Sequence, residues 1–419
     1  MAGRAGLTRI NMTAKRRNPH IAALPVTACS VLSACGCGTR SLHEALLTGE
    51  HRLQRCELID LEFPAYVGEI PTARLPQLDA RLAAFSTRNT RIALAVLDQE
   101  EDGVRAAVQR AVARYGAERV GVIIGTSTSG IYETEAAYTW REQHQALPAD
   151  FSFVNRHIWS ATARFLQQEL HLEGPCYAVS TACSSSSKTL ASAQRLIVNG
   201  VCDAVLTGGV DSLCHMTLHG FKSLDIMSAK PCTPLDRDRC GISLGEAGGL
   251  LLLERPQPDH AGCVQLLGCG ESSDAYHMTA PHPEGRGAIA AMQQALAQAG
   301  LAASDIDYVN LHATGTLLND RAEMAAMAGV FAADMCCSGT KGLTGHTLGA
   351  AGAVESIVTW LSLKHGFMPG TCGLQQVDEA FACNVLKDSM NDVSVRIAMN
   401  NNFGFGGNNT SLILGRPDA

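Results

Sequence analysis

Short apolar segments alternate with amphipathic ones along most of the chain. From residue 24 onward, runs rich in Val, Ile and Leu that predict buried strands are followed by stretches whose apolar positions recur at helical spacing. The predicted strands are 24–31, 119–124, 176–180, 204–207, 249–254, 263–269, 308–311, 393–399 and 410–414. The predicted helices are 42–47, 181–197, 287–299, 319–330 and 349–363. This alternation is typical of α/β layers that enclose buried sheets.

The same pattern divides the chain into three parts. Residues 1–20 are basic and contain no Asp or Glu; we interpret them as a disordered tail, with a targeting peptide, a nucleic-acid arm or an overlong start as alternatives. An N-terminal half is predicted over 21–258 and a C-terminal half over 259–419. In each half a reactive residue, Cys183 or His346, stands at the mouth of a helix rich in Ala and Ser. A duplicated fold with its site between the halves would explain this similarity between the halves. Coincidence is the alternative, because helices that end at Gly are common.

Composition and charge narrow the classes of function. The 419 residues are 46% hydrophobic and 17% charged, which is enough apolar material for a large core. A net charge of -7 argues against a protein that binds nucleic acid or a membrane surface through basic residues. No apolar run approaches the roughly 18 residues of a membrane span. We therefore expect a cytoplasmic protein that binds neither nucleic acid nor membrane.

The chain contains 16 cysteines but no C-x-x-C pair, which predicts reduced thiols and no metal site. Cys183 differs from the others because it ends a predicted strand, opens a helix and is followed by four serines. The N-terminus of a helix favours a thiolate, and its free N–H groups can stabilise an oxyanion. Cys183 is therefore a candidate nucleophile, and the alternative is a buried structural cysteine.

Two histidines strengthen the nucleophile interpretation. His312 follows a predicted strand in LHATGT, and His346 stands in KGLTGH, just before GAAG. Histidines at such turns, together with a cysteine at the mouth of a helix, favour a nucleophile with its bases. The loop NFGFGGN at 402–408 leads into a strand, whereas a dinucleotide-binding glycine loop leads into a helix. We therefore expect this loop to bring a backbone N–H close to the site as a second oxyanion donor. Segment 125–130 is similar to the G-x-S-x-G motif of serine hydrolases, but Ser replaces its last Gly and no helix is predicted after it.

Four segments carry a resemblance to a known family. They are VSTACSS around Cys183, HATGT at His312, KGLTGHTLGAAG from Lys341 and NFGFGGN from Asn402. Together they resemble the β-ketoacyl-acyl carrier protein synthases of the elongating Cys-His-His class, and SSDAYHMT at 272–279 is similar to the synthase II branch. The resemblance implies a thiolase fold, with duplicated βαβαβαββ halves in a five-layer α-β-α-β-α arrangement. It also implies a homodimer, with a heterodimer as the alternative, and no permanently bound cofactor, since the phosphopantetheine arm of acyl carrier protein carries the substrates.

The resemblance further implies a reaction and roles for individual residues. An acyl group held on Cys183 would condense with malonyl-acyl carrier protein to give β-ketoacyl-acyl carrier protein and CO2, in fatty acid elongation. His312 and His346 match the pair that binds the malonyl thioester and promotes decarboxylation. Phe405 matches a gate whose backbone N–H is an oxyanion donor. The other matched residues are an active-site lysine, Lys341, the substrate-binding residues Thr314, Thr316, Thr279 and Gly406, and the supporting residues Glu355, Asp320 and Glu323.

The sequence departs from the family pattern at Ala313, at Asn408 and over 133–155, where the match to synthase II is poor. The acyl chain length therefore stays open. One alternative function is a ketosynthase of a specialised polyene or polyketide pathway. Another is a non-catalytic partner similar to a chain-length factor, although such partners typically lack the nucleophilic cysteine. A biosynthetic thiolase would use two cysteines and one histidine.

An acidic carrier protein needs a basic patch on this acidic chain. Two groups of cations lie close together in sequence. They are Arg81, Arg88 and Arg91, and Lys230, Arg237 and Arg239. We expect one group to dock the carrier protein, and a merely solvated helix face is the alternative.

Overall fold

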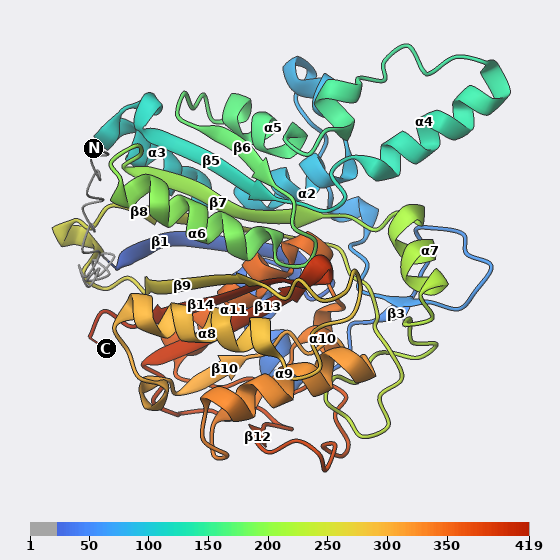
Figure 1. The fold of residues 1–419 in the computed structure, drawn as a ribbon. Helices are drawn as coiled ribbons and strands as arrows, with labels where there is room; N and C mark the ends of the chain where they lie inside the picture. The colour runs from blue at the N-terminus through green and yellow to red at the C-terminus, as the bar shows by residue number, and fades with distance from the viewer. Residues whose placement is uncertain (1–22, 419) are drawn as a thin grey trace, which may run out of the picture.

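The computed structural model describes residues 23–418, so the predicted tail at 1–20 lies outside the described part. Its centre is one continuous sheet of 12 strands, drawn in Figure 1. The longer strands are β1 (Leu24–Ser33), β5 (Val120–Gly125), β6 (Cys176–Val179), β7 (Ala204–Asp211), β8 (Ala247–Glu254), β9 (Gln265–Ser273), β10 (Tyr308–Asn310), β11 (Cys336–Ser338), β13 (Ile397–Gly404) and β14 (Asn408–Gly415). The two-residue strands β2 (Gly36–Cys37) and β12 (Asn384–Val385) extend this sheet, and β3 (Gln54–Arg55) pairs with β4 (Tyr66–Val67).

The sheet consists of two halves with the same strand order. From the outside inward, the first half runs β6-β5-β7-β8-β1 and the second runs β11-β10-β13-β14-β9. Apart from the short β12, which lies outside β11, each half therefore begins at the outer edge with its third strand, followed by its second, fourth, fifth and first. In both halves the second, third and fourth strands are parallel and the fifth is antiparallel. The first strands, β1 and β9, pair antiparallel at the centre. The predicted duplicated thiolase fold is confirmed.

Helices complete the five predicted layers. The middle layer holds α6 (Ser185–Val198) and α11 (Ala351–His365), which contact each other and both halves of the sheet. One outer layer has α2 (Arg88–Leu97), α3 (Val104–Tyr115) and α5 (Ala161–Glu169), and the other has α8 (Arg286–Ala299) and α9 (Leu317–Val330). The other helices are α1 (Thr39–Thr48), α4 (Ile131–His144), α7 (His215–Ser223) and α10 (Lys341–Thr344). Most of α11 is buried, as a helix enclosed on all sides requires.

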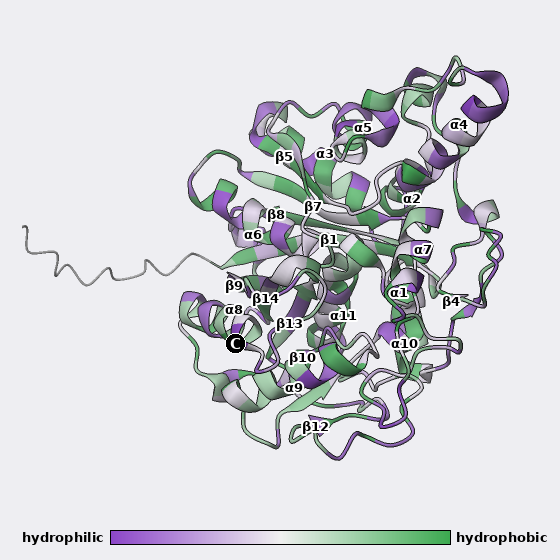
Figure 2. Ribbon diagram, turned by 45° about the vertical axis from the view of Figure 1, so that its right-hand side comes forward, coloured by the Kyte–Doolittle hydropathy of each residue, from purple (hydrophilic) through white to green (hydrophobic). Residues whose placement is uncertain are grey.

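Small residues let the two middle helices come into direct contact. A side chain at Gly352 would begin 2.5 Å from the backbone nitrogen of Ser187, so α11 could not lie this close to α6 with any other residue there. The hydroxyl of Ser186 accepts the N–H of Ala353 at 2.9 Å. The serines after Cys183 are all fully buried at this contact. Figure 2 shows that the strands beside them, β5, β7 and β8, are mainly hydrophobic. The serine run therefore packs the middle layer.

Most predicted strands and helices are present, with shifted ends. The outer helices α2, α3 and α5 and the exposed α4 and α7 were not predicted. The statement that no helix follows segment 125–130 is wrong, because α4 begins at Ile131; its apolar residues do not gather on one face, so the pattern is weak. Ser127 in that segment donates to the buried carboxylate of Asp211 at 2.7 Å, which is a structural contact. Among residues 23–418, no helix has the length and apolar character needed to cross a membrane.

Candidate active site

Cys183 lies at the junction between β6 and α6, as the sequence predicts. The residue before it, Ala182, has a φ of 52°, so the backbone turns sharply out of the strand. The thiol is buried in the middle of the molecule. This turn directs Cys183 toward the second half of the fold, from which both histidines come.

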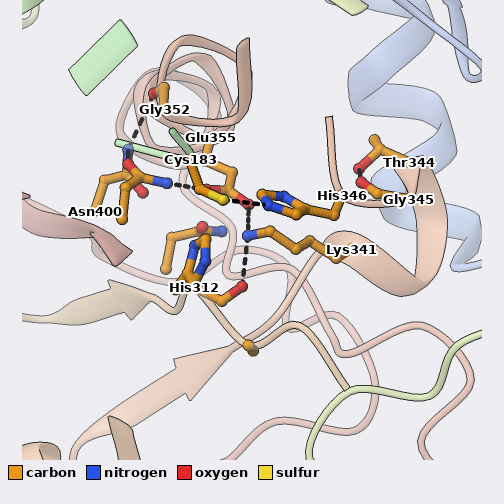
Figure 3. Close-up of polar contacts among 12 residues, drawn as sticks. Cys183, His312, Lys341, Thr344, Gly345, His346, Gly352, Glu355 and Asn400 are labelled. Atoms are coloured by element: carbon orange, nitrogen blue, oxygen red, sulfur yellow. Dashed lines mark hydrogen bonds and ion pairs between the residues drawn. The ribbon is translucent and has the colours of Figure 1, made fainter. Parts of the chain in front are cut away.

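The two histidines and the thiol form one buried cluster, shown in Figure 3. His312 follows β10, and His346 lies between α10 and α11. The Nε2 atom of His346 is 2.8 Å from the Sγ atom of Cys183. The two imidazole rings meet edge to face, with centroids 5.2 Å apart. One nitrogen of each histidine and the Cys183 sulfur all lie within 4.8 Å of one another. A single reacting group can therefore touch all three side chains.

Burial keeps the cluster neutral. It lowers the pKa of His312 and of His346 well below the usual value, and the nearby ammonium of Lys341 lowers both further. Burial also raises the pKa of the Cys183 thiol to about 11, although the backbone N–H groups of Phe405 and Cys183 and the Lys341 charge act in the opposite direction. The N–H groups therefore act in favour of the thiolate, as expected, but desolvation outweighs them in the free protein. Neutral imidazoles can instead donate a hydrogen bond to a developing enolate.

The predicted oxyanion donors converge on the sulfur. The tip of the β13–β14 hairpin carries Phe405, whose backbone N–H points toward the Cys183 thiol. A side chain at Gly404 would begin 3.1 Å from the Cys183 nitrogen, which is closer than most Cβ contacts, so glycine favours this close approach. The Phe405 ring stacks on Phe221 of α7, with centroids 5.4 Å apart. The hairpin tip therefore brings a backbone donor and an aromatic ring to the thiol together.

Lys341 belongs to a buried polar network behind the cluster. Its ammonium donates to the backbone carbonyl of His312 at 2.5 Å and forms an ion pair with Glu355. Glu355 also accepts the side-chain amide of Asn402 at 2.5 Å, and Ser187 donates to the same Asn402. The sequence analysis assigned no function to Asn402 and Ser187. The signal that could have revealed them is the run of three asparagines at 400–402 within a buried strand, because such side chains need partners.

Two buried carboxylates organise the segment after His312. Glu323 accepts the backbone N–H groups of His312 and Ala313, each at 2.7 Å, although burial raises the pKa of Glu323 to about 8. Asp320 accepts the N–H groups of Leu235 and Gly315 at 2.9 and 3.2 Å. Ala313 has a φ of 29°, a backbone conformation that favours glycine. Both carboxylates act on the backbone that carries His312 rather than on the cavity.

A cavity of about 290 Å³ leads to the cluster. Its walls include the four residues predicted to bind substrate, namely Thr279, Thr314, Thr316 and Gly406. Thr314 and Thr316 face each other with their hydroxyl oxygens 3.0 Å apart. Further lining residues that nothing in the sequence indicated include Phe221, Cys240, Leu317 and Leu318. Leu317 and Leu318 are exposed at the first turn of α9, where an apolar side chain gives no signal of a cavity rim.

The thiol and the two imidazoles are close enough to ligate a metal ion. Imidazoles in metal sites usually donate their second N–H to a carbonyl or carboxylate. The Nδ1 atoms of His312 and His346 have no such partner within residues 23–418. The positive charge of Lys341 next to the cluster also opposes a bound cation. The donor set therefore fits acid–base chemistry better than metal binding.

The structure corrects both predicted docking patches. Arg88 is buried and pairs with Glu246 at 2.5 Å. Arg239 is buried between Asp320 at 3.4 Å and Asp378 at 2.8 Å. Arg91 donates to the backbone carbonyls of Leu75 and Pro76. These arginines hold the fold together, so neither group is a continuous exposed patch. Sequence proximity does not reveal such pairs, because the partner of Arg88 is 158 residues away.

Comparison with known proteins agrees with this geometry. The family model described as the N-terminal domain of β-ketoacyl synthase matches residues 24–258, and the one for the C-terminal domain matches 263–375. The chain is 32% identical to 3-oxoacyl-[acyl-carrier-protein] synthase 2 of Rhizobium meliloti, covering 93% of this chain and 98% of that protein. It is 31% identical to the mitochondrial 3-oxoacyl-[acyl-carrier-protein] synthase of Arabidopsis thaliana, covering 99% and 97%.

Solved structures agree as well. A chain from the complex of the ketosynthase ApeO with its chain length factor ApeC, from Xenorhabdus doucetiae, superimposes with a TM-score of 0.86 at 41% identity, covering 95% of this chain and 99% of that one. A β-ketoacyl synthase from Burkholderia phymatum gives a TM-score of 0.82 at 27% identity, covering 94% and 99%. With a duplicated sheet, a buried thiol and two neutral imidazoles in the matched regions, the chain belongs to the β-ketoacyl synthase family.

Proposed function

We propose that this protein is a β-ketoacyl-acyl carrier protein synthase that elongates fatty acids by decarboxylative Claisen condensation. The observation that carries the proposal is the pairing of the Cys183 thiol with His346 at 2.8 Å, with His312 beside them, at the end of a cavity. A thiol can hold an acyl group as a thioester, and two neutral imidazoles can stabilise an enolate next to it. The cluster of Cys183, His312 and His346 can therefore carry out both the acyl transfer and the condensation.

In the first half-reaction the Cys183 sulfur attacks the thioester of acyl-acyl carrier protein. Because burial raises the pKa of the thiol and lowers that of the imidazole, the proton stays on the sulfur of the free protein and passes to Nε2 of His346 only as the new S–C bond forms. The oxyanion accepts the backbone N–H groups of Cys183 and Phe405. The thioester bond to phosphopantetheine then breaks, and its sulfur leaves as a thiol with the proton returned by His346.

In the second half-reaction His312 and His346 donate hydrogen bonds to the thioester carbonyl of malonyl-acyl carrier protein, His346 in the tautomer that carries its proton on Nε2. The bond to the carboxylate breaks, CO2 leaves, and the electron pair becomes an enolate stabilised by both donors. The enolate carbon attacks the acyl thioester on Cys183, forming the new C–C bond. The S–C bond to Cys183 then breaks, and the Cys183 thiolate takes a proton from Nε2 of His346. Water replaces that proton, which is the one that the loss of CO2 from the malonyl carboxylate consumes. Lys341 and Glu355 hold His312 through its backbone carbonyl.

The substrates arrive on the phosphopantetheine arm of acyl carrier protein. Thr314 and Thr316 supply hydroxyl groups along the cavity that the arm would enter. Exposed cations flank the cavity: Lys222 follows the lining residue Phe221, and Arg321 lies one turn after Leu317 on α9. We propose these two cations, together with the exposed Lys230, as the docking patch in place of the buried arginines.

We also propose that the enzyme acts in the cytoplasm as a homodimer. The segment from α4 to α5 presents large exposed apolar side chains, Tyr138, Trp140, Phe153 and Trp159. Patches of this kind commonly mark protein interfaces. The strand β6 at the end of the sheet also has an edge with no neighbouring strand within residues 23–418. A second copy of the chain is the partner that we propose for this side.

The test is mass spectrometry of the intact protein incubated with a panel of acyl-acyl carrier proteins of increasing chain length. We expect one acyl adduct, on Cys183, and condensation after malonyl-acyl carrier protein is added. Cys183→Ala should show neither, whereas Cys183→Gln should retain malonyl decarboxylation. An adduct on another cysteine, or substantial condensation by Cys183→Ala, would overturn the proposal. Loading of only unsaturated or ketone-bearing chains would instead support the specialised polyene or polyketide function.

A further inference from the structure

Two consecutive residues of α6 hold the two arms of the hairpin that carries Phe405. The hydroxyl of Ser187 donates to Oδ1 of Asn402 on β13. The ammonium of Lys188 donates to Oδ1 of Asn408, the first residue of β14, at 3.1 Å. Because α6 begins two residues after Cys183, the helix that positions the thiol also holds both arms of the hairpin.

Lys188 occupies an unfavourable place for a cation. It lies in the first turn of α6, where the helix dipole repels positive charge. It is half-buried, and burial lowers the pKa of its ammonium. A lysine at such a position needs an acceptor, and the side-chain oxygen of Asn408 provides one. The Lys188–Asn408 hydrogen bond therefore offsets part of the free energy lost by placing a half-buried ammonium at the N-terminus of the helix.

Asn408 in turn touches the hairpin tip. Its Nδ2 atom lies 3.3 Å from the point where a side chain on Gly406 would begin. The N–H of Gly406 also donates to the carbonyl of Met278 at 2.7 Å. A side chain at Gly404 would begin 3.1 Å from the Cys183 nitrogen, so the backbone of the hairpin lies tightly against that of Cys183. The tip is therefore held by Met278 and by Asn408, and Lys188 connects Asn408 to α6.

We propose that Lys188 and Asn408 are positioning residues that fix the backbone N–H of Phe405 relative to the Cys183 sulfur. This inference rests on the proposed function, because it assigns the two residues to the acyl-transfer half-reaction. Malonyl decarboxylation depends on His312 and His346, which come from other segments. Loosening the hairpin should therefore slow acyl transfer and spare decarboxylation, a split that a general loss of packing would not produce.

The experiment compares Lys188→Met, Asn408→Leu and the double variant with Arg195→Met, which removes an exposed cation from the same helix. Single-turnover acylation of Cys183 by acyl-acyl carrier protein is followed by intact mass. We expect it to slow about 10- to 100-fold in each single variant, the range for a misplaced catalytic group. The double variant should be no slower than either single variant, because both remove the same contact. Asn408→Asp keeps the acceptor and should acylate at nearly the wild-type rate, as should Arg195→Met.

Decarboxylation of malonyl-acyl carrier protein is measured with the same substitutions in a Cys183→Gln background, and we expect it to be unchanged. Unaltered acylation in Lys188→Met and Asn408→Leu would overturn the inference. An equal loss of both half-reactions would also overturn it, because that is the signature of a structural role. If the wild-type protein is not acylated at all, the proposed function itself fails. This result differs from the two outcomes that would overturn only the role of Lys188 and Asn408.

Discussion

The Nε2 atom of His346 lies 2.8 Å from the sulfur of Cys183, although 163 residues separate them in the sequence. The two side chains come from different halves of the duplicated sheet. Both are buried, so water does not screen their interaction. The pair is poised for proton transfer, but burial keeps it in the neutral thiol–imidazole form.

Alkylation of Cys183 should depend steeply on pH. Because burial raises the pKa of its thiol to about 11, the thiolate fraction should increase about tenfold per pH unit between pH 7 and 9. The rate can be measured with iodoacetamide, followed by mass spectrometry of the peptide that contains Cys183. A rate that reaches a plateau below pH 8 would contradict the neutral-thiol assignment. The exposed Cys240, in the same samples, serves as the internal control.

The stability of the protein should fall as the pH decreases below 6.5. The pKa values of His312 and His346 are lowered in the folded state, so the unfolded chain binds protons first. Each histidine should remove up to about 1.4 kcal/mol of unfolding free energy per pH unit in that range. Urea denaturation at pH 7.5, 6.5 and 5.5 measures this slope. His312→Asn should have a shallower slope than wild type, and an identical slope would contradict the prediction.

Breaking the buried pair of Lys341 and Glu355 should be costly. Glu355→Gln leaves the Lys341 ammonium buried without its counter-charge, which should reduce the unfolding free energy by about 3 kcal/mol. Decarboxylation should decline as well, because Lys341 holds the His312 carbonyl. The double variant Lys341→Met/Glu355→Leu should lose less stability than the sum of the single variants. Additive losses in urea denaturation would show that the two groups do not interact.

Charge reversal beside the cavity should weaken recognition of the carrier protein. Lys222→Glu and Arg321→Glu should raise KM for acyl-acyl carrier protein several-fold, with a larger effect at low salt. The alkylation rate of Cys183 should not change. The matched control is Arg110→Glu, an exposed position on α3 in an outer layer. Equal KM values for Lys222→Glu, Arg321→Glu and the control would refute this docking patch.

Sequence patterns were sufficient for the strands of the core and for selecting the three candidate residues that the structure brings together. Strands such as β5 and β8 are continuous apolar runs, and Cys183, His312 and His346 each stand at a turn marked by Gly or Thr. These are local signals, since they arise from backbone geometry and burial of neighbouring residues.

The features that could not be predicted from the sequence depend on contacts between distant segments. Arg88 was predicted to be a surface cation because no neighbouring residue in the sequence indicates that it pairs with Glu246. The sequence indicated the helix terminus that favours a thiolate at Cys183, because that feature is local, but not the desolvation that raises the pKa, because it comes from the whole fold. Helix α4 was missed because its exposed faces carry both aromatic and charged residues. Each of these errors has a tertiary cause.

The antiparallel pairing of β1 with β9 limits how the cluster can be reached. It makes the two halves a single hydrogen-bonded slab, and the contact of Gly352 with Ser187 fixes the spacing of the helices inside it. A molecule that enters the cavity must pass the Phe405 ring, its Phe221 neighbour and the exposed leucines of α9, which all line it. The continuous sheet therefore fixes where the reacting groups stand, and the side chains that line the cavity decide what can reach them.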